Sequence, residues 1–171
     1  MDLFRKKSMY RLWLTVLGTG YSPFAPGTCG SAVVTVVFLL AALLGASPFL
    51  VGIIMLVLAV HGLVVTVIYG DRLIAQYGPD PRLIVSDEQC GQALTYLCFA
   101  WMRPAITGSK ETIIFALVGF VLFRVLDIIK PPPARQFDNM KNPWGVALDD
   151  VMAGIYANIT LQIIWWLEIM R

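Results

Sequence analysis

Five carboxylates lie near the ends of three apolar stretches of this chain, and they are the residues best suited to chemistry. In chain order they are Asp87, Glu88, Asp127, Asp149 and Asp150. The first two and the last two are adjacent pairs that begin their stretches, whereas Asp127 lies near the end of its own. Several hard oxygen ligands, with no histidine or thiolate nearby, suit Mg²⁺ or another hard cation. The pattern therefore indicates a cation site built from three helix ends.

Helix capping is the competing interpretation of the paired acids. The helix macrodipole stabilises an acid in the first turn by about 0.3–1 kcal/mol. This explains any one of the four, but not why acids are doubled at two helix starts. It also fails for Asp127, because the carboxyl end of a helix disfavours negative charge. Arg124, one turn before Asp127, and Lys130 could offset that charge, as could a divalent cation.

Small residues precede the first long apolar stretch, in the sequences GTG at 18–20 and PGTCGS at 26–31. Backbone N–H groups at a helix start can bind an anion, and Thr28 and Ser31 add hydroxyl groups. A glycine-rich segment that only turns the chain is the alternative interpretation.

A basic segment, KPPPARQFD at 130–138, follows the stretch that holds Asp127. Its three prolines stiffen the loop, and Lys130 and Arg135 could bind a phosphate or a lipid headgroup. Alternatively, these two residues only reflect the general enrichment of basic residues in cytoplasmic loops. Arg124 is harder to explain in that way, because it lies within an apolar stretch beside Asp127.

The composition indicates which elements must position these residues. Of the 171 residues, 58% are hydrophobic and only 14% are charged, and the mean hydropathy is +0.73. Soluble domains average about 25% charged residues, so a very apolar soluble core is a poor alternative to a membrane protein. The net charge of +2 and the lack of a basic patch with aromatic residues argue against nucleic-acid binding. Three cysteines without a CxxC pair predict neither disulfides nor a zinc site.

Five apolar stretches are long enough to be membrane helices. They cover residues 28–45, 49–69, 83–102, 113–129 and 148–167. The sequence GASP at 45–48 predicts a tight hairpin, and the three prolines end the fourth stretch. We expect an all-α, polytopic membrane protein with about five membrane-embedded helices in a single domain, 1–171.

The distribution of charge predicts an orientation. With a cytoplasmic N-terminus and five crossings, most basic residues, including Arg5, Lys6 and Lys7, face the cytoplasm, as the positive-inside rule requires. The same topology places the five acids at the cytoplasmic face. Four crossings, with 83–102 omitted, would divide the acids between two compartments, so we prefer five.

Several known chemistries are excluded by what the sequence lacks. The only histidine, His61, lies in the middle of an apolar stretch, so a histidine-dependent phosphatase or a Ser-His-Asp triad at the cytoplasmic face is ruled out. No cysteine is followed six positions later by arginine, which excludes the Cys-x5-Arg phosphatase loop.

Five motifs, in this order along the chain, resemble the phosphatidylglycerophosphatase A family. They are GTG at 18–20, PGTCGS at 26–31, DEQCGQ at 87–92, FRVLDIIKP at 123–131 and GVALDDVMAG at 145–154. The resemblance implies a Mg²⁺-dependent enzyme of the bacterial cytoplasmic (inner) membrane that removes the terminal phosphate of phosphatidylglycerophosphate to give phosphatidylglycerol. It also implies that the five acids belong to the active site, and that Arg124, Lys130, Thr28 and Ser31 match family positions.

Pattern and resemblance together predict metal-assisted hydrolysis of a phosphomonoester. We expect the two acid pairs (Asp87, Glu88, Asp149 and Asp150) to hold one or two Mg²⁺ ions, with Glu88 or Asp127 orienting the attacking water. Arg124 and Lys130 would balance charge on the phosphoryl oxygens, and Thr28, Ser31 and Arg135 are further substrate-binding candidates. A covalent aspartyl phosphate remains open.

Two other classes of membrane protein remain as alternatives. One is a helical protein that binds or conducts a divalent cation without phosphatase activity. The other is an enzyme that joins lipid headgroups with aspartates, although the Asp-Gly pair expected there is missing. The expected partners are the lipid substrate and the bilayer, and no protein partner is evident.

Overall fold

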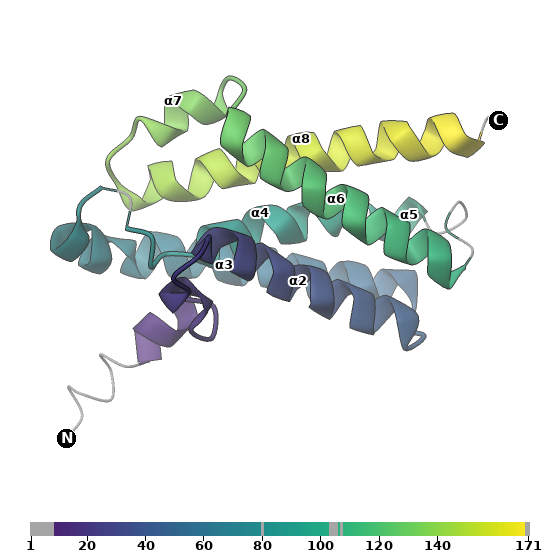
Figure 1. The fold of residues 1–171 in the computed structure, drawn as a ribbon, viewed down its shortest axis with the longest axis horizontal. Coiled ribbons are helices and arrows are strands. Elements are labelled where there is room, and N and C mark those ends of the chain that lie inside the picture. Colours follow the sequence, from purple (N-terminus) through teal and green to yellow (C-terminus); the bar gives the residue numbers. More distant parts are fainter. Residues whose placement is uncertain (1–8, 80, 103–105, 107, 170–171) are drawn as a thin grey trace.

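The computed structural model of the protein describes residues 9–79, 81–102, 106 and 108–169. Within these residues every regular element is helical, which confirms the all-α prediction (Figure 1). The basic residues Arg5, Lys6 and Lys7 lie outside the described part of the chain. Residues 9–14 are helical, and the elements that follow are η1 (Thr19–Tyr21), α2 (Pro26–Leu43), α3 (Pro48–Tyr77), α4 (Ser86–Tyr96), α5 (Phe99–Met102), α6 (Ser109–Ile129), α7 (Ala134–Asp138) and α8 (Pro143–Ile169).

Three of the described helices, α2, α3 and α6, are long and apolar enough to cross a membrane. The expected count of five is not confirmed. The stretch 83–102 is not one spanning helix, because α4 has only 11 residues and α5 only four. At 1.5 Å per residue, α4 is about 16 Å long, roughly half the thickness of a hydrocarbon core. The fifth stretch does form a long helix, α8, but this helix contains acids and amides and is not among the three candidate spans.

The hairpin between α2 and α3 forms where the sequence predicts it. Ser47 caps α3 by accepting a hydrogen bond from the N–H of Leu50 at 3.2 Å, and Pro48 is the first residue of the helix. Gly45 has φ 88°, a left-handed conformation that glycine adopts without strain. Helix α3 continues to Tyr77, two turns beyond the predicted end, so the polar residues after 69 are helical.

Helix α4 lies at the centre of the molecule and packs against α2, α3, α6 and α8. Its tightest contact is with α8, where a Cβ atom on Gly154 would lie 2.3 Å from the carbonyl oxygen of Gly91. On α3, a Cβ on Gly62 would lie 2.3 Å from the carbonyl oxygen of Ser86. Glycine at these crossings lets the backbones approach, as small residues do in membrane helix pairs.

Aromatic packing fixes the other end of α4. The ring of Tyr96 stacks on Phe38 of α2 with centroids 4.4 Å apart. Its hydroxyl lies 2.9 Å from the Thr35 hydroxyl and donates to the carbonyl oxygen of Ala116 on α6 at 2.7 Å. A fully buried tyrosine is stable because its hydroxyl is satisfied in this way.

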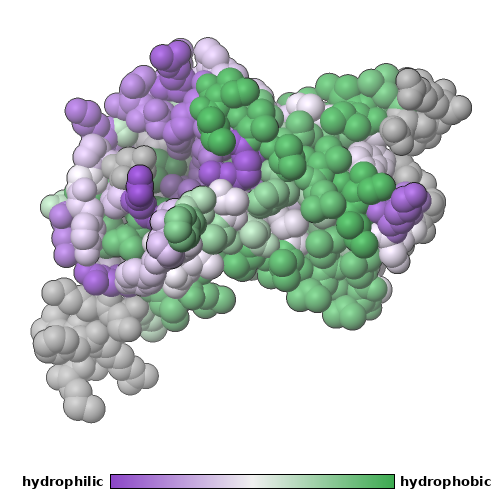
Figure 2. All heavy atoms as spheres, viewed as in Figure 1, coloured by the Kyte–Doolittle hydropathy of each residue, from purple (hydrophilic) through white to green (hydrophobic). Residues whose placement is uncertain are grey.

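The path of the chain places the acids at one end of the bundle. Helices α4 and α5 together run from the acidic end toward the opposite end, and α6 returns (Figure 1). The acids of α4, the end of α6 and the start of α8 are therefore neighbours, although α4 is not the single spanning helix that we expected. Figure 2 shows hydrophilic residues gathered at this end, over α7 and the start of α8, and apolar residues over much of α2 and α6.

Candidate active site

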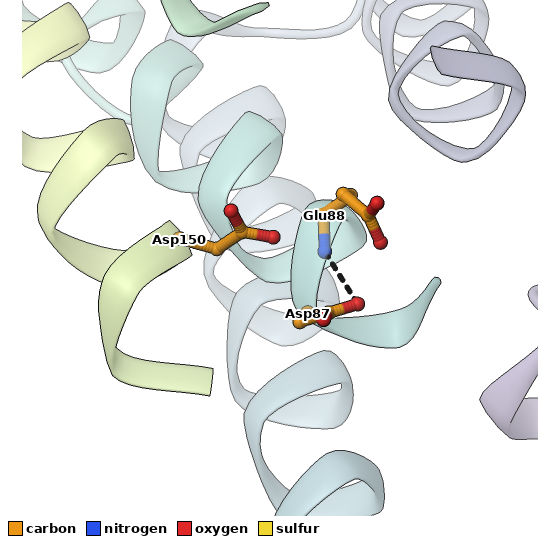
Figure 3. A group of neighbouring side chains, drawn as sticks. All are labelled: Asp87, Glu88 and Asp150. Carbon is orange, nitrogen blue, oxygen red and sulfur yellow. Dashed lines mark hydrogen bonds between the residues drawn. The ribbon is translucent and has the colours of Figure 1, made fainter. Parts of the chain in front are cut away.

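A cavity of about 500 Å³ opens at the acidic end, and all five predicted acids line it. They come from three helices: α4 supplies two, α6 supplies Asp127, and α8 supplies two. In Figure 3 the carboxylate of Asp150 on α8 is directed toward the first turn of α4, which carries Asp87 and Glu88. Lys130 and residues 138–141 close part of the same cavity.

Hydrogen bonds from α3 hold the first turn of α4 in place. The hydroxyl groups of Ser86 and Thr66 lie 2.6 Å apart in the buried interior. The side-chain amide of Gln89 donates to the carbonyl oxygen of Leu58 at 2.7 Å and contacts Nδ1 of His61 at 3.0 Å. His61 is thus a hydrogen-bonding residue that positions α4, in line with its place in an apolar helix.

The two acids of α8 lie one turn further into their helix than the sequence predicted. Helix α8 begins at Pro143 rather than near 148, because Asn142 caps it by accepting a hydrogen bond from the N–H of Gly145 at 2.9 Å. Asp149 and Asp150 are therefore in its second turn. Capping does not explain them, since the macrodipole acts mainly within the first turn.

Two groups of acids could each hold a metal ion. One consists of Asp87, Glu88 and Asp150 and the other of Asp127, Asp149 and Asp150, with one oxygen from each member within 4.8 Å of the others. Asp150 belongs to both groups, and it is only 3% exposed. Asp127 is a ligand candidate here, although the expected Mg²⁺ ligands were only the two acid pairs. The donors are all carboxylate oxygens, which suit a hard divalent cation.

The two cations of the predicted site are paired with acids. Arg124 forms an ion pair with Asp127 at 3.1 Å, and one of its terminal nitrogens lies 3.5 Å from the Ser31 hydroxyl. Lys130 donates to Asp149 at 2.6 Å and also to Asp138. The lining of the first cavity holds six acids and only two lysines, Lys130 and Lys141, so acidic residues are in excess there.

Burial raises the pKa of three acids that lie outside the three candidate spans. Desolvation raises the pKa of Glu88 and of Asp150 well above the ordinary range, and neighbouring carboxylates add to the effect. Desolvation also raises the pKa of Asp149 to about 7, although Lys130 opposes this. One buried oxygen of Glu88 has no hydrogen-bond partner among the described residues. A bound cation would relieve both the repulsion and the unsatisfied oxygen, so the residues fit a metal site.

A second cavity of about 330 Å³ shares Asp87 and Glu88 as a wall with the first, and it is lined by Thr28 and Arg124. A Cβ on Gly27 would lie 1.9 Å from Oε1 of Glu88, so glycine lets α2 begin beside this carboxylate. Ser31 is fully buried one turn later, and its hydroxyl donates to the carbonyl oxygen of Gly27 at 3.0 Å.

The structure does not bring every predicted residue into the site. Arg135 is exposed on α7, and it lines neither of the two polar cavities. Conversely, Arg82 lines the second cavity and was not predicted. No motif marks Arg82, which lies in the irregular segment before α4, although its place five residues before Asp87 is a weak signal.

Comparison with known proteins agrees with the geometry. The family model described as phosphatidylglycerophosphatase A matches residues 12–165. A protein of Bacteroides thetaiotaomicron named putative phosphatidylinositol-3-phosphatase is 31% identical over 157 residues, covering 89% of this chain and 91% of the relative. Proteins named phosphatidylglycerophosphatase A are 32% identical in Escherichia coli, covering 81% of this chain and 73% of the relative, and 33% identical in Haemophilus influenzae, covering 88% and 85%. No solved structure matches the chain.

Proposed function

The chain belongs to the phosphatidylglycerophosphatase A family of membrane phosphatases, and we propose that it hydrolyses the terminal phosphomonoester of phosphatidylglycerophosphate in a Mg²⁺-dependent reaction. The products are phosphatidylglycerol and inorganic phosphate. The observation that carries the proposal is the convergence of five acids from three helices in one cavity at an end of the bundle. A lipid can present its headgroup there while its acyl chains stay beside the apolar helices.

In our proposal the acids are the ligands of the magnesium ions. Asp87, Glu88 and Asp150 would hold one ion, and Asp127 and Asp149 with the shared Asp150 would hold a second. When bound, Mg²⁺ would neutralise charge on the phosphoryl oxygens and lower the pKa of water. The clustered acids and the unsatisfied oxygen of Glu88 support this assignment.

The protein's own residues would then position the reactants. Glu88 is better placed than Asp127 to accept a proton from the attacking water, because Asp127 is paired with Arg124. The oxygen of that water forms the new bond to phosphorus as the bond to the glycerol oxygen breaks, and the leaving oxygen takes a proton from solvent. Lys130, which lines the same cavity as the five acids, supplies positive charge beside the phosphoryl group, whereas Arg124 lines the neighbouring cavity.

The alternative chemistry, a covalent aspartyl phosphate, differs in its intermediate. Both mechanisms place one ¹⁸O from H₂¹⁸O in the released phosphate, but direct attack by water forms no phosphorylated protein. Isolation of a phosphorylated aspartate after acid quenching would contradict the direct mechanism.

We also propose that the acidic end faces the cytoplasm of a bacterial inner membrane. Basic residues support this orientation, because Arg72, Arg82, Lys130 and Lys141 lie near the acids while Lys110 starts α6 at the far end. A cysteine introduced at exposed position 141 should react with a membrane-impermeant maleimide only after the cells are opened. Labelling in intact spheroplasts would reverse the orientation.

The central experiment measures phosphate release by purified protein from phosphatidylglycerophosphate, with Mg²⁺ or with EDTA. We expect EDTA, Asp149→Asn and Asp150→Asn each to abolish the activity. Asp71→Asn is the matched control, because Asp71 is exposed on α3 and lines neither polar cavity. Full activity in EDTA or in Asp150→Asn would refute the metal assignment.

The same preparation tests the alternative of a cation-conducting protein. Both groups of acids that could hold a metal, among the described residues, lie at the same end of the bundle, which favours a surface site over a pore. Divalent-cation flux into proteoliposomes without phosphate release would reverse the choice.

A further inference from the structure

The second cavity shares Asp87 and Glu88 with the first, and its other residues have the chemistry of an anion site. Two guanidinium groups, Arg82 and Arg124, line it together with the start of α2. Among the described residues Arg82 has no ion pair or hydrogen bond, whereas Arg124 is held by Asp127 and Ser31. Arg82 therefore offers donors that the protein itself does not use.

The backbone of α2 adds further donors to this cavity. The first main-chain hydrogen bond of the helix runs from the N–H of Cys29 to the carbonyl oxygen of Ala25. Pro26 has no N–H, and the N–H groups of Gly27 and Thr28 precede that bond, so neither has an acceptor within the helix. Free N–H groups at the start of an 18-residue helix, beside two arginines, favour an anion.

The two cavities differ in a way that assigns them to different anions. The first holds all five acids and both groups suited to a metal, so the reacting phosphomonoester belongs there. The second holds two of the acids, Asp87 and Glu88, in the wall that it shares with the first. An anion in the second cavity is thus a neighbour of the reacting phosphate and not the reacting phosphate itself.

A lipid with a phosphorylated polyol headgroup carries such a pair of anions. Its phosphomonoester is at the far end of the headgroup, and its phosphodiester joins the headgroup to the diacylglycerol. We propose, building on the proposed function, that the cavity lined by Arg82 and Arg124 binds the phosphodiester, and that Arg82 distinguishes substrates with two phosphates from lipids that carry the monoester alone. Arg82 is exposed and also lines this cavity, so its guanidinium is accessible to a lipid phosphate.

The test compares two lipids with identical acyl chains in mixed micelles, phosphatidylglycerophosphate and phosphatidic acid, which lacks the phosphodiester. We expect Arg82→Ala to raise KM for phosphatidylglycerophosphate about tenfold, as the loss of a charged hydrogen bond implies. The kcat/KM for phosphatidic acid should stay within about twofold, because a lost donor has no partner on that lipid. Arg82→Lys should be intermediate, since an ammonium keeps the charge without the guanidinium fork.

Two controls separate a local effect from a general one. Arg72→Gln removes an arginine from the same end of the bundle, where its guanidinium lies 4.9 Å from the Tyr10 ring and outside both polar cavities. It should leave the ratio of the two kcat/KM values unchanged. Binding of short-chain phosphatidylglycerol, which has only the phosphodiester, should weaken about tenfold in Arg82→Ala, while binding of the matching diacylglycerol should not change.

Each outcome decides a question. Equal losses on both lipids in Arg82→Ala would mean that Arg82 acts on the reacting phosphate or on the fold, and no loss on either would mean that the cavity is not used. Both results overturn the proposal. If the wild-type protein releases phosphate from neither lipid, the proposed function fails, and unchanged phosphatidylglycerol binding in Arg82→Ala would then overturn the phosphodiester site as well.

Discussion

The contact between α4 and α8 controls the geometry of the acids, and Gly154→Ala tests this. Gly154 is one turn after Asp150, on the same side of α8. The added Cβ would lie 2.3 Å from the carbonyl oxygen of Gly91 and 2.9 Å from its Cα. These are backbone atoms that cannot rotate away. To lengthen the shorter contact to even 3.0 Å, the two helices must separate by about 0.7 Å.

Such a shift should impair activity far more than stability. Overpacking costs about 1–3 kcal/mol of folding free energy, whereas a displacement of about 1 Å between reacting groups lowers the rate roughly 100-fold. Asp150 would move away from Asp87 and Glu88, so binding of Mn²⁺ as a magnetic probe for the metal should also weaken. We expect a 10- to 100-fold lower rate of phosphate release per folded molecule, on the same reasoning.

Gly52→Ala is the matched control at the other end of the bundle. There the added Cβ would lie 2.8 Å from Cβ of Ala100, between α3 and α5, so the steric conflict is milder and remote from the acids. This variant should lose some thermal stability in detergent and keep its activity per folded molecule. Equal specific activities in the two variants, or unchanged Mn²⁺ affinity in Gly154→Ala, would refute the idea that this crossing positions the site.

Three further predictions test the site and its supports. Gly27→Ala places a Cβ 1.9 Å from Oε1 of Glu88, and the Glu88 side chain can rotate away from it. Mn²⁺ affinity and phosphate release should therefore fall at least about tenfold, with little change in the thermal midpoint. Unchanged activity would show that Glu88 is not part of the site. In EDTA, folding stability should decrease as pH rises from about 4 to 7. The reason is that the folded state keeps protons on carboxyls such as Asp149, whose pKa is raised to about 7, whereas the unfolded state releases them. Saturating Mg²⁺ should reverse this trend in thermal melts, and a thermal midpoint that rises with pH in EDTA would contradict the prediction. Thr66→Val leaves the buried Ser86 hydroxyl without its partner at 2.6 Å and should cost about 1–3 kcal/mol in denaturant unfolding, whereas the double variant with Ser86→Ala should cost less than the sum of the two single changes.

The helical class and the grouping of acids were predictable because they depend on composition and on chain direction. Long apolar stretches between proline and glycine breaks specify helices, and their alternating direction brings Asp87, Asp127 and Asp149 to one end. The pairing of Arg124 with Asp127 follows from helical spacing alone. These features need no knowledge of which helices touch.

Features that depend on contacts between helices were not predictable. The end of α4 after Tyr96 follows no proline or glycine, and the hydrophobic run continues through 97–102. Asp150 is shared between two groups of acids only because α8 crosses α4 at Gly91. Arg82 enters the second cavity through the path of an irregular segment, for which no sequence pattern exists.

The shortness of α4 has a consequence for how the protein is made. An 11-residue helix that carries Asp87 and Glu88 in its first turn cannot cross lipid as an independent unit, since it is only about half as long as a hydrocarbon core is thick. Four helices pack against α4: α2 and α3 are synthesised before it, and α6 and α8 are synthesised after it. The packing around α4 is therefore complete only after α8 has been synthesised. A nascent chain that stops before α8 would lack one of the four helices that cover the acidic helix.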